Sequence, residues 1–234
     1  MDNKILLALP VYNEEKVLEK SVLKLYNYFK NNIKDDWQIV IVNNASIDKT
    51  KKVADSLAQK FLKVDSLNLE DKGRGNALKN VWQKYEADIY AYCDIDLATD
   101  IFAFKKLFNS IINGSANIAI GARYIKGSQT KRTLNRLIYS KVYIFLVRLF
   151  FPTKIKDFQC GFKAVDKKTV SEILPLVKDK EWFFDTELLL IAEKNDFKIK
   201  EIAVQWKENP ETKVKFIRTI YDYIENLIKF KKYY

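Results

Sequence analysis

"DIYAYCDIDLATD", residues 88–100, joins an apolar run to a cluster of acidic side chains. The run from 89 to 93 is rich in residues that favour strands, and acids follow it at Asp94, Asp96 and Asp100. A buried strand that ends in polar residues is typical of α/β proteins, which place their chemistry at the carboxyl ends of parallel strands. The stretch therefore predicts a central strand with an acidic rim.

The same pattern occurs three times before this stretch. Strands are expected at 4–9, 37–46, 63–67 and 88–96, and helices between them at 13–30, 48–61 and 72–85. Alternating strands and helices imply right-handed crossovers and a mostly parallel sheet flanked by helices, an α/β fold of the Rossmann type. The strands end in "PVYNEE", "NNASID", "KGRG" and "DIDLATD". Four polar clusters at one sheet edge predict a functional site there.

The second half of the chain is less regular. We expect a strand at 116–124, a long helix over 131–152 that ends at Pro152, a helix beginning near 181, a strand at 198–206 and a basic amphipathic C-terminal helix. No linker or repeat separates the halves. We interpret residues 1–234 as one domain with a C-terminal elaboration.

Composition excludes several kinds of catalyst. The 234 residues are 48% hydrophobic, with 6 Gly and 4 Pro, which favours a well-packed globule. Histidine is absent and the cysteines are Cys93 and Cys160, so a His-based triad, a Cys/His zinc cluster and a disulfide framework are excluded. We expect both cysteines to be buried. Catalysis must rely on carboxylates, a metal ion or the charge of the substrate.

The charge balance is strongly basic. Lys plus Arg number 41 against 30 acids, a net charge of +11. This favours an anionic partner, such as nucleic acid, an anionic membrane surface or a phosphorylated substrate, although coding bias toward lysine would produce the same excess. No 18 consecutive residues are apolar, and acids interrupt the N-terminus too early for a signal peptide. We expect a cytoplasmic chain.

Two clusters offer groups for binding phosphate and metal. If the segment is extended, Asp94 and Asp96 share a face, and two carboxylates suit a hard cation such as Mg²⁺ or Mn²⁺. Such a pair alone is also common in solvated turns. "KGRGNA" supplies Lys72, Arg74 and two glycines that allow a phosphate to approach the backbone, although a simple turn before a helix explains it equally.

Together these motifs resemble the inverting glycosyltransferases of family 2, which have the GT-A fold. The matching stretches are "LPVYNEE", "IVIVNNASIDKT", "KGRGNAL", "DIDLATD", "IGARY", "DFQCGFKAV" and "WFFDTELLLIAEK…IKEIAVQWKENPETKV". The later ones resemble the polyprenyl-phosphate branch, in particular the dolichyl-phosphate glucosyltransferases. The similarity runs in order from about residue 4 to residue 215.

The resemblance implies roles for individual residues. The nucleotide sugar would contact Pro10, Tyr12, Asn13, Glu14, Asn43, Asn44, Ser46, Lys72, Arg74 and Asp94. Asp94 and Asp96 would hold the metal and its diphosphate, and Arg123, Asp185 and Glu187 would complete the catalytic set. The second loop usually reads Asp-Asp-Gly-Ser in this family, whereas here it is Asn43-Asn44-Ala45-Ser46. An amide both donates and accepts hydrogen bonds, whereas a carboxylate only accepts, so the usual acids are no guide to which nucleotide base this chain selects.

The acceptor side follows from chemistry and resemblance together. A polyprenyl phosphate is already anionic and needs no strong general base, but it needs cations, for which Arg123, Arg132 and Arg136 are candidates. Gln159, Gly161 and Lys163 are expected to line the same cavity, and Trp206 and Lys213 to lie near the diphosphate. Residues 134–151 suit a helix in the membrane interface, although a core helix or a dimer interface would show the same pattern.

These observations predict the transfer of a hexose, with inversion and a divalent metal, from a nucleotide diphosphate sugar to polyprenyl (dolichyl) phosphate. The resemblance alone favours UDP-glucose as the donor, and GDP-mannose remains possible. The protein is expected to lie peripherally on the cytoplasmic membrane face. The alternatives are a saccharide or protein hydroxyl acceptor, with Asp185 or Glu187 as base, a nucleotidyltransferase, and a basic nucleic-acid-binding module; the first reading expects no nucleic acid.

Overall fold

The computed structural model describes residues 3–208 and 216–234, and for 216–222 it describes the backbone alone. A seven-stranded sheet forms its centre, built from β1 (Lys4–Val11), β2 (Asp36–Asn44), β3 (Val64–Leu69), β4 (Ile89–Cys93), β5 (Ile118–Ala122), β7 (Phe162–Asp166) and β8 (Ile199–Ala203). The strand order is β3-β2-β1-β4-β7-β5-β8. All pairings are parallel except those of β7, which runs antiparallel to β4 and β5. The prediction of a mostly parallel sheet is confirmed.

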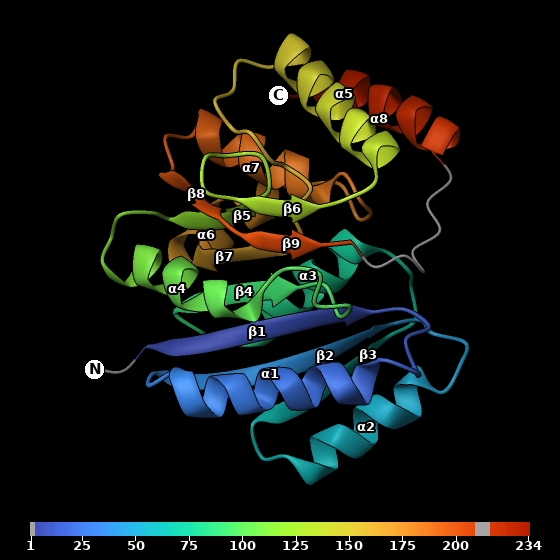
Figure 1. Cartoon of the computed structure of the whole chain (residues 1–234), viewed down its shortest axis with the longest axis vertical. Coiled ribbons are helices and arrows are strands. Elements are labelled where there is room, and N and C mark those ends of the chain that lie inside the picture. The colour runs from blue at the N-terminus through green and yellow to red at the C-terminus, as the bar shows by residue number, and fades with distance from the viewer. Residues whose placement is uncertain (1–2, 209–215) are drawn as a thin grey trace.

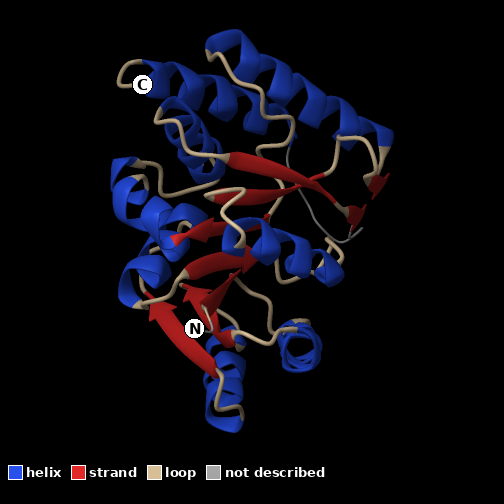
Figure 2. Cartoon of the chain, turned by 90° about the vertical axis from the view of Figure 1, so that its left-hand side faces the viewer, coloured by secondary structure: helices blue, strands red, loops and turns tan. Residues whose placement is uncertain are grey.

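Helices cover both faces of this sheet (Figures 1 and 2). They are α1 (Leu18–Asn32), α2 (Thr50–Lys60), α3 (Arg74–Lys84), α4 (Phe104–Ile112), α5 (Leu134–Phe150), α6 (Lys167–Glu172), α7 (Phe184–Lys194) and α8 (Phe216–Lys231), with 3-10 turns at Ile101–Ala103 and Leu174–Leu176. Side chains of α1, α2 and α4 pack on one face of the sheet, and those of α3, α5, α7 and α8 on the other. Because side chains alternate along a strand, Ile5 and Leu7 pack in the core on one face of the sheet, and Leu6 and Ala8 pack in the core on the other.

Several elements differ from the sequence prediction. Strand β4 ends at Cys93, and the acids that follow it lie in a turn in which Leu97 has a φ of 49°. The strand expected at 198–206 is divided into β8 and the short β9 (Gln205–Lys207), which pairs with β6 (Gln129–Lys131) in a second sheet. Pro152 does follow the end of α5, and Cys93 and Cys160 are buried free thiols, as expected.

The second half of the chain completes the sheet of the first. Strand β7 inserts between β4 and β5, so the main chain after 123 returns to the centre of the molecule. Helices α5 and α8 lie side by side at one end, away from α1 and α2 (Figure 1). Across the described residues, no helix combines the length and apolar character that crossing a bilayer requires.

Candidate active site

The loops after β1 and β2 are joined by hydrogen bonds at the carboxyl edge of the sheet. The Asn13 amide donates to Ser46 Oγ at 3.0 Å, and the Ile47 amide donates to Asn13 Oδ1 at 2.9 Å. The Glu14 amide donates to Thr50 Oγ1 at 2.7 Å. Asn13 has a φ of 56°, a left-handed conformation that asparagine tolerates better than most residues. Two of the loops expected to bind a nucleotide thus form one surface.

A third loop reaches the same surface. Lys72 Nζ donates to the Tyr12 hydroxyl at 2.6 Å and lies 4.4 Å from the centre of its ring. Pro10 lies in β1, two residues before Tyr12, and pairs with Val42 of β2. Residues 10–14, 43–50 and 72 are therefore neighbours in space, as the order of the motifs predicts.

The two asparagines after β2 are not equivalent. Asn43 is buried; its Nδ2 donates to Asn68 Oδ1 at 3.0 Å and its Oδ1 accepts from the Ser46 amide at 3.3 Å. Asn44 Oδ1 is buried without a hydrogen-bond partner among the described residues. Since buried polar atoms are normally satisfied, Asn44 is the residue of the pair with capacity left for a ligand.

The turn after β4 gathers negative charge. Burial raises the pKa of Asp96, and the charge of Asp94 raises it further. Burial also raises the pKa of Glu14, followed by the charges of Asp96, Asp48 and Asp94. The strand expected at 88–96 ends at Cys93, so Asp94 and Asp96 follow it in the turn and the condition for a shared strand face is not met, but the two remain close enough to repel each other.

Arg74 offsets part of this charge. Its Nη1 donates to Asp94 Oδ1 at 2.6 Å, and its Nε lies 3.7 Å from Asp185 Oδ2. The ring of Trp182 lies over the guanidinium, with 5.0 Å between Cζ and the ring centre. Burial acts to lower the pKa of Arg74, but Asp94 and the other anions around it raise the pKa overall. Arg74 therefore connects the acidic turn to the start of α7.

Lys163 is fully enclosed beneath this site. Its ammonium lies 3.0 Å from Asp185 Oδ1 and donates to the carbonyl oxygens of Phe158 at 3.0 Å and Cys160 at 2.6 Å, and to the Tyr92 hydroxyl at 3.1 Å. The Tyr92 hydroxyl in turn donates to Asp185. With every donor of Lys163 engaged, the expectation that it lines an acceptor cavity is not supported. It instead positions Asp185 and the 158–160 loop.

Glu187 also has a structural role. It is fully buried in the first turn of α7, where its two carboxylate oxygens accept from the amides of Lys178 at 2.9 Å and Asp179 at 2.7 Å. The Tyr233 hydroxyl donates to it at 3.0 Å. Both oxygens are occupied, so the structure does not support Glu187 as a catalytic group or a general base.

Two glycine contacts shape the site. A Cβ atom at Gly161 would overlap the whole carboxyl group of Asp94, whose Oδ1 would lie 2.5 Å away. At Gly75 a Cβ would meet Asp179 O at 2.9 Å, and the amide of this residue donates to Glu181 O at 3.2 Å. The glycines of the third loop thus approach the chain's own 179–181 segment, where we expected a phosphate cradle, whereas Gly161 makes room for Asp94.

Arg123 forms a buried ion pair. Its Nε and Nη2 donate to Asp157 Oδ2 and Oδ1, each at 2.8 Å, and its backbone amide donates to the same carboxylate at 2.9 Å. Burial would raise the pKa of Asp157, but the charge and hydrogen bonds of Arg123 lower it. The planar pair of bonds fastens the end of β5 to the loop before β7, so Arg123 is not the open phosphate ligand that we expected.

Arg132 has unused hydrogen-bonding capacity, as has Arg74, whose Nε is also buried without a hydrogen-bond partner among the described residues. Arg132 donates to the Tyr124 hydroxyl and, at 2.8 Å, to Ser140 Oγ, while its Nε is buried without a partner among the described residues. Burial lowers the pKa of Arg132, and the charge of Arg123 lowers it further. The Trp206 ring centre lies 5.5 Å from Arg123 Cζ and 5.3 Å from Arg132 Cζ.

The remaining candidates have partners elsewhere. Arg136 forms an ion pair with Glu208, and Gln159 Nε2 donates to the Tyr223 hydroxyl of α8 at 2.7 Å. Trp206 pairs with Thr99 of the acidic loop through an isolated bridge, which links the arginine cluster to the turn after β4. Lys213 lies outside the described residues.

Sequence reasoning missed three participants. Asp157 was given no role, although a buried arginine requires a carboxylate partner. Tyr92 lies in the apolar run 89–93 and was given no role, but its hydroxyl bridges Lys163 and Asp185. Trp182 belongs to the aromatic cluster before α7 and is 67% exposed beside Arg74. The available signal was the juxtaposition of aromatic and charged residues at these positions.

Comparisons with known proteins agree with this geometry. The family model "Glycosyl transferase family 2" matches residues 7–174. Glycosyltransferase AglD of Haloferax volcanii is 31% identical over 93% of this chain, which spans 35% of that protein's length. Dolichyl-phosphate beta-glucosyltransferase ALG5A of Trichomonas vaginalis is 34% identical over 89% of this chain and 67% of its own.

A solved structure has the same fold. Glucosyl-3-phosphoglycerate synthase from Mycobacterium tuberculosis, in complex with Mn²⁺, UDP and glucosyl-3-phosphoglycerate, superposes with a TM-score of 0.71 at 13% identity, covering 97% of this chain and 78% of that one. The sheet with its flanking helices is therefore of the GT-A type. Because the family model matches most of the chain, and its motifs meet at one edge of that sheet, the protein belongs to glycosyl transferase family 2.

Proposed function

We propose that the protein transfers a hexose from a nucleotide diphosphate sugar to polyprenyl (dolichyl) phosphate with inversion at the anomeric carbon. The observation that carries this proposal is the engagement of Asp185 and Glu187, the two carboxylates that the sequence offered as general bases. Both are buried and bound by internal partners, so neither is placed to take a proton from a hydroxyl. A phosphate acceptor needs no such base. The name of the Trichomonas vaginalis relative points to the same acceptor.

Residues 1–123 supply the donor side in this proposal. The joined loops of Tyr12, Asn13 and Ser46 surround the nucleotide, and the free carbonyl of Asn44 accepts a hydrogen bond from the base. Uracil and guanine both carry ring N–H groups, so an amide oxygen suits either base. UDP-glucose is the favoured donor, and GDP-mannose is the alternative.

The acidic turn fits a divalent cation. Oxygen atoms of Asp94 and Asp96 are the ligand type that Mg²⁺ and Mn²⁺ prefer, and the pKa of Asp96 is raised first by burial and then by the charge of Asp94, both of which a cation would offset. Among the described residues no cluster of three or more acids, cysteines or histidines is arranged to hold a metal, so the remaining ligands would come from the diphosphate and water. A bound cation supplies Lewis-acid stabilisation of the departing diphosphate.

Residues 124–234 supply the acceptor side. Arg132, with its unpaired Nε, receives the lipid phosphate, and Arg123, whose charge is paired with Asp157, holds its loop in place beside Trp206 and Arg132. A phosphate oxygen attacks the anomeric carbon and forms the new C–O bond, while the bond to the diphosphate breaks and the nucleoside diphosphate leaves with the electron pair. Because the acceptor lies in a membrane, the protein works at the cytoplasmic membrane surface.

Release of nucleoside diphosphate tests this function directly. Purified protein with Mg²⁺ or Mn²⁺ is given UDP-glucose or GDP-mannose, with and without a short polyprenyl phosphate. We expect release that requires the lipid phosphate and one of the two donors. Asp96→Asn should abolish it, whereas Asp196→Asn, a matched change at an exposed turn with a φ of 60°, should not. Equal release to water or to a saccharide hydroxyl would overturn the proposed acceptor.

A further inference from the structure

Helix α5 carries an exposed apolar stripe on the face opposite its packing contacts. The stripe consists of Leu134, Ile138, Val142, Phe145 and Leu149, which recur every three or four residues. Ser140, Tyr143 and Val147 are buried on the other face, where α5 meets α8 and the sheet. Phe145 is 64% and Leu149 66% exposed, so the stripe is a continuous outer surface. Apolar patches of this kind mark interaction surfaces.

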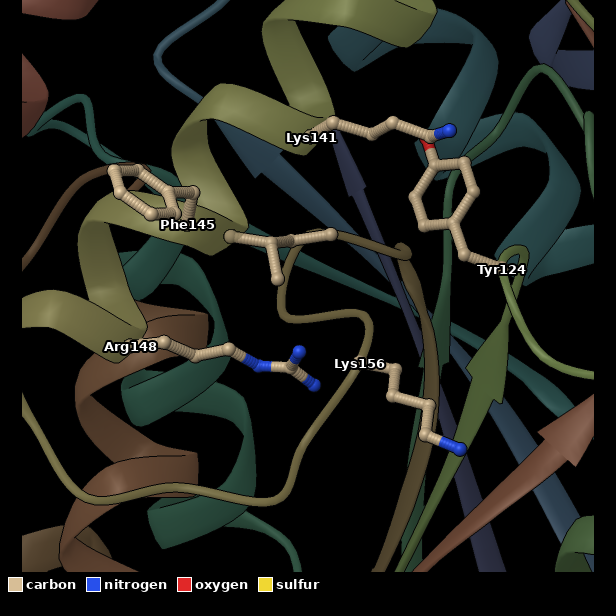
Figure 3. Close-up of a pocket in the computed structure, with 6 residues that line it drawn as sticks. Tyr124, Lys141, Phe145, Arg148 and Lys156 are labelled. Atoms are coloured by element: carbon tan, nitrogen blue, oxygen red, sulfur yellow. The ribbon is translucent and has the colours of Figure 1, made fainter.

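A positively charged cavity adjoins this stripe. It has a volume of about 330 Å³ and is lined by Tyr124, Lys141, Ile144, Phe145, Arg148 and Lys156. Figure 3 shows Lys141, Phe145 and Arg148 extending from α5, across from the loop that carries Lys156. Three of the lining residues are cations and none is a carboxylate.

The cations of this cavity have donors available. Neither the Lys141 nor the Lys156 ammonium has a hydrogen bond or ion pair within the described part of the chain. Arg148 Nη2 donates to the Ile155 carbonyl at 3.0 Å, and this bond holds α5 against the loop. The other N–H groups of the Arg148 guanidinium take no part in that bond. Three such charges around one hollow favour an anion.

Phe145 belongs to both features, so the apolar stripe continues directly into the cationic cavity. A phospholipid has the same sequence of properties, because its acyl chains are apolar and its headgroup phosphate is anionic. Helices with an apolar face and flanking Lys or Arg lie in the plane of the membrane interface. A nucleic acid would satisfy the cations but would leave the stripe exposed to water.

We propose that the α5 stripe inserts into an anionic bilayer and that the cavity of Lys141, Arg148 and Lys156 binds the phosphate of one of its phospholipids. This inference extends the proposed function, because it names the surface that would bring the site to a lipid acceptor. The link to a lipid acceptor rests on the proposed function, whereas docking on the bilayer does not. Vesicles that contain neither donor nor polyprenyl phosphate test docking alone, so docking and transfer can fail separately.

The first experiment measures binding to vesicles of phosphatidylglycerol and phosphatidylcholine by cosedimentation. Each basic residue near an anionic surface contributes about 1 kcal/mol, or roughly fivefold in affinity. The triple variant Lys141→Gln/Arg148→Gln/Lys156→Gln should therefore bind roughly a hundredfold more weakly. The double variant Lys141→Gln/Lys156→Gln retains Arg148 and its bond to Ile155, and its affinity for the vesicles should fall roughly 25-fold. This variant tests the proposal even if the triple variant does not fold.

A matched control removes the same net charge from the opposite end of the molecule. Lys20→Gln/Lys51→Gln/Lys52→Gln alters exposed residues of α1 and α2 and should leave binding within about twofold. Equal losses in the two triple variants would show a general charge effect and overturn the proposal. So would unchanged binding of the double variant, binding without preference for phosphatidylglycerol, or competition by polyuridylate that displaces the protein from vesicles.

A second experiment locates the surface that inserts. An environment-sensitive fluorophore is attached at Phe145→Cys or, as the control, at Leu62→Cys, a position that is 99% exposed. The native thiols are buried and should not react. We expect anionic vesicles to shift the emission of the label at 145 to the blue and to leave that at 62 unchanged. A shift at 62, or none at 145, would refute insertion through α5.

Discussion

Gly161→Ala should impair catalysis while leaving the fold intact. The added Cβ would overlap the Asp94 carboxyl group, with 2.5 Å to Oδ1, whereas ordinary contact begins at 3.4 Å. Because Oδ2 would lie nearer still, the carboxylate must move by more than about 1 Å, a displacement that costs an active site at least on the order of 100-fold in rate. The Asp94 side chain is 42% exposed, so it has room to turn toward solvent. Gly161 has no left-handed φ, and alanine there introduces no backbone strain.

The assay for this prediction compares rate, metal binding and stability in the same variant. We expect the rate of nucleoside diphosphate release to fall about 100-fold, and the free energy of unfolding in urea to fall by about 1.5 to 3 kcal/mol because the displaced carboxylate no longer accepts from Arg74. Affinity for Mn²⁺, followed by electron paramagnetic resonance, should fall together with the rate. Gly114→Ala is the opposite control: its Cβ meets nothing, but its φ of 69° should cost about 1 kcal/mol of stability without slowing the reaction.

A double mutant separates an effect through Asp94 from a general one. If Gly161→Ala acts by displacing the carboxylate, then combining it with Asp94→Asn should slow the reaction no further than Asp94→Asn alone. Additive losses in the double variant would refute this reasoning. An unchanged rate in the single variant would do the same, because the overlap requires a shift of Asp94.

Three further predictions concern buried contacts. Arg123 lowers the pKa of Asp157 in the folded protein below its unfolded value of about 4. The ion pair should therefore stabilise the fold above about pH 4, and this stabilisation should be lost as the pH falls through the folded pKa. Asp157→Asn should remove this part of the pH dependence of the free energy of unfolding in urea. Lys163→Met leaves buried carboxylate charge uncompensated and should lower the free energy of unfolding by about 3 to 5 kcal/mol, with near-normal stability refuting the assignment. Gly73→Ala, at a φ of 141° and against the Lys180 carbonyl, should lower the melting temperature by several degrees, roughly 2 to 4 °C for each kcal/mol.

The strands of the first half were predictable because burial on both faces makes them continuous apolar runs. Residues 5–9 and 39–42 are almost completely buried, and the polar residues after them mark the carboxyl edge. The place of β7 was not predictable in the same way. Its antiparallel pairing between β4 and β5 depends on strands distant in sequence, and the local pattern of 157–165 carries no information about direction.

The candidate site was predictable as a set of loops but not as a set of partners. Lys163 was expected to line the acceptor cavity, and only the meeting of α7, β4 and β7 encloses it against Asp185. Arg123 likewise looked open, yet it pairs with a carboxylate 34 residues away. In both cases the residue type suggested charge, while topology decided whether that charge faces a ligand or another side chain.

The distribution of charge explains why the acidic turn is the part of the site suited to a cation. Arg74 and Lys163 face Asp94 and Asp185, and these two cations and two carboxylates offset one another within the protein. Asp96 and Glu14 have no such partner among the described residues, and burial together with neighbouring acids raises the pKa of each. The fold thus leaves two carboxylates at the sheet edge without an ion-pair partner of their own among the described residues, and the charge of Arg74, which holds Asp94 in position, offsets that of Asp96 only in part. Under the proposed function a divalent cation held by Asp94 and Asp96 would balance that remainder, whereas a further lysine or arginine at this edge would neutralise it from within the protein.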